Sequence, residues 1–183
     1  MRRIIYMILA YILIGVMIGS ASVIGDALSI KEAKKLPAVS IDAGNVRSKI
    51  GATVNIPIRL RKRGGDIPVV GFNVDMTFDS DTLKVLDVFM NPTNIADKIV
   101  AWNQIDDDTI RFIVYGLNKS IIPAGTVVYV HVQVLDTATP GETTSLILSN
   151  GAVTDPDANP LNFILKNGTF IIQKQRIYYN GTE

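Results

Sequence analysis

Short segments in which apolar and polar residues alternate fill the chain from residue 39 to residue 172, and this pattern constrains the fold more than any other feature. In the segment GFNVDMTF at 71–78, every second residue is apolar. A period of two places one side of a strand in a core and the other in water. The segments with strand character are 39–42, 53–60, 71–78, 83–90, 99–105, 109–115, 126–136, 143–148 and 162–172.

Turn-forming residues separate these segments, as at Gly64-Gly65, Pro140-Gly141 and Asn167-Gly168. Gly, Pro, Asn and Asp each favour turns for a distinct conformational reason. Nine short strands spaced in this way predict an all-β fold, a nine-stranded antiparallel β-sandwich with jelly-roll topology. No internal repeat and no second globular domain is evident.

Composition narrows the classes of function. The 183 residues carry a net charge of +1, which argues against nucleic-acid binding, because that activity needs a concentrated basic face. The longest basic run, Arg59–Arg63, precedes Gly64-Gly65 and predicts an exposed strand end. The absence of cysteine excludes disulfides and thiol nucleophiles, so a hydrophobic core must supply the stability.

The N-terminus predicts export. Arg2 and Arg3 precede an uncharged apolar run over 4–24, and the next charge is Asp26. This pattern fits a signal peptide, and an uncleaved membrane anchor is the rival interpretation. Both place the rest of the chain outside the cell or on its surface. The expected organisation is a hydrophobic helix at 1–25, a linker at 26–37, the sandwich at 38–173 and a flexible tail at 174–183.

The residues argue against an enzyme. The only histidine, His131, lies in the middle of a predicted strand, which argues against a Ser-His-Asp arrangement. The turns Asp155–Asn159 and Asp106–Asp108 offer oxygen ligands for an ion, but neither has the remaining ligands of a calcium loop nearby. Whether the first turn binds an ion stays open, and no cofactor is expected.

Three stretches together resemble the cohesin domain family. They are GATVNIPIRL at 51–60, VVGFNVDMTFDSDTLKVLDV at 69–88 and NGAVTDPDANPLNFILKNGTFII at 150–172. The resemblance implies a non-catalytic jelly roll that binds a dockerin, with calcium on the partner and not on this chain. It also implies that the segments 71–77, 99–105, 109–115 and 143–148 form the binding face.

The strand at 110–115 is apolar on both sides, so something should cover its outer side. Either Ile113 and Tyr115 point outward, with Arg111, or Phe112 and Val114 do. The expected partner-binding residues are Asn73, Asp75, Thr77, Trp102, Gln104, Arg111, Ile113 and Tyr115, and the resemblance to cohesins adds Leu117 and Asn118. Trp102 also fits a core position, and the loop 117–125 or a second copy of the chain could supply the cover instead.

Two other functions remain open. A carbohydrate-binding sandwich needs exposed aromatic residues in a row, which Trp102 and Tyr115 could begin, with Tyr129 on another strand. A surface or adhesion domain that assembles with itself is the other. Contact with a membrane is expected only through the N-terminal segment.

Overall fold

The computed structural model describes residues 39–65, 67–93 and 97–174, which belong to the second of the two units into which the chain divides, residues 37–183. Within these ranges the regular elements are all strands. They include no helix that is long and apolar enough to cross a membrane. The predicted N-terminal helix, the linker at 26–37 and nearly all of the predicted tail lie outside the described residues.

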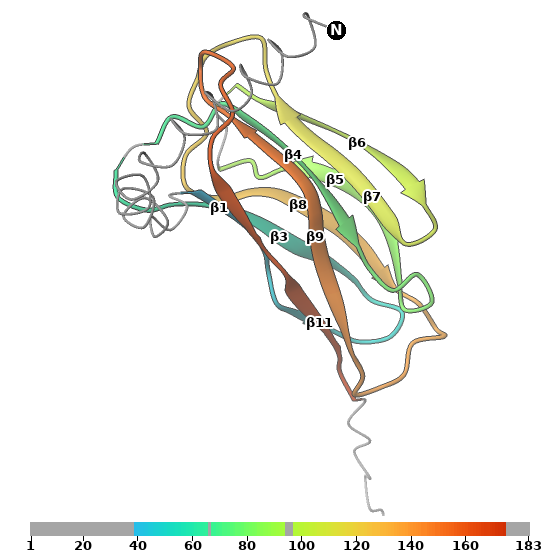
Figure 1. Cartoon of the computed structure of the whole chain (residues 1–183). Helices are drawn as coiled ribbons and strands as arrows, with labels where there is room; N and C mark the ends of the chain where they lie inside the picture. The colour runs from blue at the N-terminus through green and yellow to red at the C-terminus, as the bar shows by residue number, and fades with distance from the viewer. Residues whose placement is uncertain (1–38, 66, 94–96, 175–183) are drawn as a thin grey trace, which may run out of the picture. The chain divides into compact units, whose positions relative to one another are not determined.

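Eleven strands form a two-layered sandwich (Figure 1). The five-stranded sheet has the order β10-β1-β3-β8-β5, built from β10 (Phe163–Lys166), β1 (Val39–Ala43), β3 (Thr53–Lys62), β8 (Gly125–Val134) and β5 (Leu83–Met90). The six-stranded sheet has the order β2-β11-β9-β4-β7-β6, built from β2 (Val46–Ser48), β11 (Gly168–Ile172), β9 (Thr143–Thr154), β4 (Gly71–Thr77), β7 (Thr109–Tyr115) and β6 (Ile99–Asp106).

The all-β sandwich is confirmed, but the prediction of nine antiparallel strands is wrong. The first predicted segment forms only β1, and β2 after it was not predicted, whereas the last predicted segment divides into β10 and β11, one in each sheet. The count therefore rises from nine to eleven. These four strands also pair in parallel, β1 with β10 and β2 with β11, so both sheets are mixed. A pairing between segments more than 100 residues apart leaves no local signal in the sequence.

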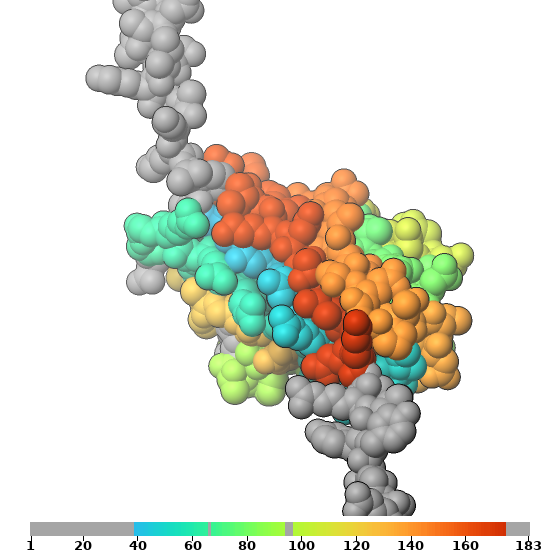
Figure 2. Space-filling model, turned by 90° about the horizontal axis from the view of Figure 1, so that it is seen from below, coloured from blue at the N-terminus to red at the C-terminus, as the bar shows by residue number. Residues whose placement is uncertain are grey.

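The two ends of the domain cross between the sheets at the same place. The chain leaves β1 at Gly44, and it enters β11 at Gly168. A Cβ atom on Gly168 would lie 2.9 Å from the carbonyl oxygen of Ala43 and closer still to that of Gly44. Figure 2 shows the blue and cyan atoms of the first strands beside the red atoms of the last. Only glycine leaves room for the two backbones here.

The core lies between the sheets and follows the period-two pattern. Phe72, Val74 and Met76 of β4 point inward, as do Phe112 and Val114 of β7, and all five are buried. From the other sheet, alternate residues of β3 and β8 meet them, including Ile56, Ile58, Leu60, Val128, Val130 and Val132. The burial of Phe112 and Val114 decides which side of β7 is free, because neighbouring side chains of a strand point to opposite faces.

Candidate docking face

Four adjacent strands present one continuous outer surface, which we call the β9-β4-β7-β6 face. The strand register arranges its outward residues in rows across the strands. The first row is Thr154, Gly71, Tyr115 and Ile99, and the second is Ala152, Asn73, Ile113 and Ala101. The third is Ser149, Asp75, Arg111 and Asn103, and the fourth is Ile147, Thr77, Thr109 and Asp106.

One end of this face is apolar and open. Ile113 is 43% exposed, Tyr115 is 41% exposed, and Ile99 beside them is 54% exposed. Ala101 completes the patch between Ile99 and Ile113. Within the described residues no loop covers these side chains. Apolar side chains gathered in this way on a sheet mark a surface that binds another molecule.

The middle of the face holds a charged pair. Arg111 donates from Nε to Oδ1 of Asp75 at 2.6 Å and from Nη2 to Oδ2 at 2.8 Å. The side chain of Asp75 is only 3% exposed, whereas that of Arg111 is 52% exposed. Asn150 donates from Nδ2 to Oδ2 of Asp75 at 2.9 Å. The carboxylate is therefore covered and satisfied, and the guanidinium is the group that a binding partner would meet.

The Arg111 pair sets the ionisation of Asp75. Its hydrogen bonds lower the pKa of the Asp75 carboxyl below the ordinary value of 3.8, burial acts in the opposite direction, and the bond from Asn150 adds to the lowering. A carboxyl whose pKa is lower in the folded than in the unfolded state stabilises the fold above the unfolded value. This contribution is lost as the pH falls below 3.8 and through the folded-state pKa.

We therefore expect the free energy of unfolding of the wild type to fall more steeply below about pH 4 than that of Asp75→Asn, which has no carboxylate at this position to protonate. Urea denaturation between neutral pH and about pH 2.5 measures both curves. Asp81→Asn is the matched control, because Asp81 is exposed, and it should follow the wild type. Parallel curves for Asp75→Asn and the wild type would contradict this assignment.

Two other predicted residues of β4 lie on the same face. Asn73 donates from Nδ2 to the carbonyl oxygen of Asn150 at 3.1 Å. The hydroxyl groups of Thr77 and Thr109 lie 3.1 Å apart and share a hydrogen bond. The structure therefore brings together six of the predicted binding residues on one surface: Asn73, Asp75, Thr77, Arg111, Ile113 and Tyr115.

Trp102 and Gln104 point to the other side of β6. Trp102 pairs with the buried Phe112, and Gln104 pairs with the buried Ile110, so both are directed toward the inner side of the sheet. Trp102 packs against the core, and its Nε1 donates to Oδ1 of Asp87 on β5 at 3.2 Å. Trp102 therefore closes the edge of the sandwich between β5 and β6 and does not join the outer face.

Leu117 and Asn118 lie in the loop after β7. Leu117 is fully exposed. Asn118 ties its loop to the segment before β6, because Nζ of the buried Lys98 donates to the backbone oxygen of Asn118 at 2.9 Å and to its Oδ1 at 2.8 Å. Burial lowers the pKa of Lys98, and the nearby Asp97 partly offsets this effect. Asn118 thus orders the loop, and Leu117 is the residue it leaves open to solvent.

The loop at 117–125 does not cover the face. Its Ile122 is buried, and the Ile122 backbone N–H donates to the carbonyl oxygen of Val69 at 2.8 Å. The loop is therefore fixed against the segment that leads into β4. Self-cover by this loop, one of the alternatives from the sequence, is not what the structure shows.

The aromatic residues do not form a row. Tyr115 lies on the β9-β4-β7-β6 face, and Trp102 lies on the inner side of β6. Tyr129 alternates with buried Val128 and Val130 on β8, so it belongs to the outer side of the other sheet, where its ring centroid is 5.7 Å from that of Phe89. A sugar-stacking platform built from these three residues has no support in this arrangement.

The groups considered for catalysis or metal binding have ordinary local roles. Nδ1 of His131 is 2.7 Å from Oδ1 of Asn55 on the neighbouring strand. Oδ1 of Asp155 accepts hydrogen bonds from the backbone N–H groups of Asp157 and Asn159, and Lys119 pairs with Asp157 at 2.8 Å. The part of the chain that the structure describes contains no cluster of His, Asp or Glu residues able to hold a metal ion.

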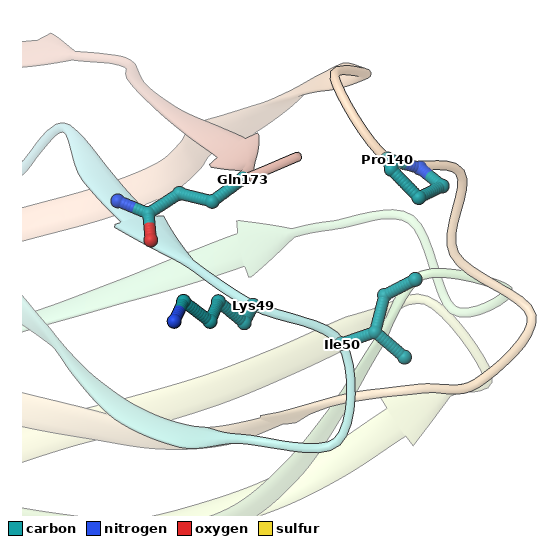
Figure 3. Close-up of a pocket in the computed structure, with 4 residues that line it drawn as sticks. All are labelled: Lys49, Ile50, Pro140 and Gln173. Atoms are coloured by element: carbon teal, nitrogen blue, oxygen red, sulfur yellow. The ribbon is translucent and has the colours of Figure 1, made fainter. Parts of the chain in front are cut away.

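Two surface cavities lie elsewhere. One, of about 270 Å³, is lined by Lys49, Ile50, Pro140 and Gln173 (Figure 3). The other, of about 480 Å³, is lined mainly by basic residues, three of which lie on β3. Neither cavity is lined by an acidic residue, so neither provides the paired carboxylates of a hydrolase.

Several residues of the face were not among the predicted set: Ile99, Ala101, Asn103, Ile147, Ser149 and Asn150. Asn150 has a φ of 48° at a break in the register between β4 and β9, and this places its side chain over Asp75. The sequence Ser149-Asn150-Gly151 has the composition of a turn, which is why the predicted strand ended at Leu148 although β9 continues to Thr154. Ile99 and Ile147 could have been predicted from the sequence as residues of the face, since each is an aliphatic residue on a strand expected to be part of it.

The fold and this open face together define a sandwich-type binding module. The sequence profile of the cohesin domain matches residues 38–172, which is most of the chain. The protein therefore belongs to the cohesin family, whose members are non-catalytic binding modules.

Solved structures agree on the fold. The chain is similar to the non-cellulosomal cohesin from the archaeon Archaeoglobus fulgidus, with 22% identity, a TM-score of 0.62, and coverage of 74% of this chain and 91% of that one. It is also similar to a chain of the type I cohesin–dockerin complex Coh-OlpC-Doc435 from Clostridium thermocellum, with 20% identity, a TM-score of 0.65, and coverage of 78% and 99%. A comparison with curated proteins gives no significant match.

Proposed function

We propose that this cohesin domain is a non-catalytic docking module that binds a calcium-loaded dockerin-type partner through the β9-β4-β7-β6 face. The observation that carries the proposal is the open apolar patch of Ile99, Ala101, Ile113 and Tyr115, which lies directly beside the Asp75–Arg111 pair. Apolar and aromatic side chains next to an arginine are the composition that protein interfaces favour at their centres. Several of the similar structures were determined as cohesin–dockerin complexes.

The chemistry of the face indicates what a partner must offer. The patch calls for apolar side chains that remove Ile113 and Tyr115 from water. Arg111 keeps its Nη1 N–H groups free of the bonds to Asp75, so the partner should offer an acceptor such as a carboxylate or the carbonyl groups at a helix C-terminus. Asp75 contributes by fixing the orientation of Arg111, since its own oxygens already accept three hydrogen bonds.

Export belongs to the same proposal. The predicted N-terminal signal or anchor lies outside the described residues, and the secreted or cell-surface location rests on its sequence alone. Jelly-roll topology also remains a proposal, supported by the order of the strands in the two sheets. A module of this kind on the cell surface would collect dockerin-bearing proteins, among which polysaccharide-degrading enzymes are candidates.

Calcium dependence tests the proposed function. The chain is immobilised, and recombinant dockerin modules of the source organism are passed over it in calcium and then in an excess of chelator. We expect saturable binding of at least one dockerin in calcium and none after chelation, because the ion would fold the partner and not this chain. Retention of the chain on insoluble polysaccharide without any dockerin binding would favour a carbohydrate-binding module. Concentration-dependent self-association alone would favour an adhesion domain.

A further inference from the structure

The cavity of about 480 Å³ at the end of β3 is a second, chemically different surface. Its lining residues are Arg59, Leu60, Arg61, Lys62, Arg63, Ala124, Gly125 and Lys166, and we call it the basic hollow. Five of these eight residues are cationic, in a chain whose net charge is only +1. The hollow belongs to the five-stranded sheet, whereas the docking face belongs to the six-stranded one.

Strand register explains why the cations gather. Asp42 of β1 pairs with Arg59 of β3 on one side and with Lys166 of β10 on the other. Arg61, one row further along β3, forms an ion pair with the same carboxylate. Neighbouring strands lie about 4.8 Å apart, so these three cationic side chains start from adjacent positions around a single acid.

This one acid does not neutralise the hollow. Asp42 is buried and bonded to Arg61, while the side chains of Arg59, Arg63 and Lys166 have no hydrogen bond or ion pair with any described residue. Arg59 and Lys166 are also partly buried. Like charges held this close repel one another, and partial burial strengthens this repulsion because it reduces the screening by water. An anion bound in the hollow would offset both the repulsion and the cost of burying the charges.

We propose that the basic hollow binds phosphate groups of a polyanion. Guanidinium groups bind phosphate oxygens in bidentate fashion, and three arginines and two lysines around one cavity suit two or more phosphates better than a single carboxylate. The phosphates can come from a soluble polymer or from the headgroups of an anionic bilayer, since both present the same chemistry. The inference does not depend on dockerin binding, because the two surfaces lie on different sheets.

The test compares the full chain with the triple variant Arg59→Gln, Arg63→Gln, Lys166→Gln. The matched control is Arg47→Gln, Lys49→Gln, Lys84→Gln, which removes three exposed cations outside the hollow. One arm titrates inorganic polyphosphate, and the other measures binding to vesicles of phosphatidylglycerol and phosphatidylcholine against vesicles of phosphatidylcholine alone. All three proteins retain the N-terminal segment, so any affinity of this segment for vesicles contributes equally to the binding of each protein.

We expect the hollow variant to bind at least one of these probes about tenfold more weakly, with a shallower dependence on salt, and the control to match the wild type. An effect in the polyphosphate arm identifies a soluble polymer as sufficient, and an effect confined to vesicles containing phosphatidylglycerol identifies the lipid headgroup. Equal binding by wild type and hollow variant in both arms would overturn the proposal. Equal losses in the hollow variant and the control would also overturn it, because they would reflect net charge alone. Thermal melts confirm that the variants are folded.

Discussion

Replacing Ile113 by Asp is expected to weaken binding of the dockerin partner by at least about 30-fold, which corresponds to roughly 2 kcal/mol, the level that marks an interface hot spot. Ile113 lies between Asn73 on β4 and Ala101 on β6, at the border of the apolar patch and the Arg111 row. A carboxylate there would have to lose its water when the partner docks, and it would compete with the partner's acceptor for the free Nη1 N–H groups of Arg111. Isothermal titration or surface binding in calcium gives the ratio of the Kd values.

Leu86→Asp is the control for this variant. Leu86 is 40% exposed, close to the 43% of Ile113, but it lies on β5 of the other sheet. Both substitutions replace an exposed aliphatic residue, so both proteins should melt close to the wild type. A loss of affinity of similar size in both variants, or no loss in Ile113→Asp, would contradict the proposal that the β9-β4-β7-β6 face binds the dockerin.

Gly168→Ala is expected to destabilise the domain by about 3 kcal/mol, at the upper end of the usual cost of overpacking. The added Cβ would collide with the carbonyl oxygens of Gly44 and Ala43, which are backbone atoms at the point where both chain ends change sheets. Relief would require separating the parallel pairs β1–β10 and β2–β11. For a domain of this size, the melting temperature should fall by about 10 °C.

Ser145→Ala provides the comparison for this prediction. Ser145 is exposed on β9, directly beside β11, where it pairs with Thr169. Its replacement should change the free energy of unfolding by less than about 0.5 kcal/mol. If Gly168→Ala has the same melting temperature as Ser145→Ala and the wild type, the structural account of a close approach between the two ends of the domain is wrong.

Most strands of this protein could be predicted from the sequence because they carry their own period-two pattern, as in 71–78, which contains β4. The short strand β2 was not predicted. The points at which the two ends of the domain cross from one sheet to the other could not be predicted from the sequence. Gly44-Asn45 and Asn167-Gly168 resemble ordinary turns, and only contact between the two ends of the domain makes them crossing points between sheets. The number of strands and their parallel pairing depend on these long-range contacts.

The candidate site was predictable along each strand and much less so across strands. Alternation within β7 offered two faces for Ile113 and Tyr115, and the burial of Phe112 and Val114 decided between them. For β6, the register with β7 turned Trp102 and Gln104 away from the face and left Ala101 and Asn103 on it. Register depends on pairing with a second strand, so one strand read by itself does not contain it.

Asp75 illustrates the same limit at the level of chemistry. From β4 alone it is an outward acid available to a partner. Its pairing with Arg111, opposite on β7, and the hydrogen bond from Asn150 at the register break in β9 make it a covered group that positions the arginine. At this point of the face, the sequence predicts that the acidic Asp75 accepts hydrogen bonds from a partner. The structure indicates instead that Arg111 donates them.

Hydrogen exchange of the backbone amides, with and without a calcium-loaded dockerin that binds the chain, tests the central claim most directly. The account predicts added protection in β4, β6, β7 and β9, concentrated around Ile113 and Tyr115, and unchanged exchange in β3, β5 and β8. Protection centred on β3, β5 or β8, with the strands of the β9-β4-β7-β6 face unaffected, would contradict it.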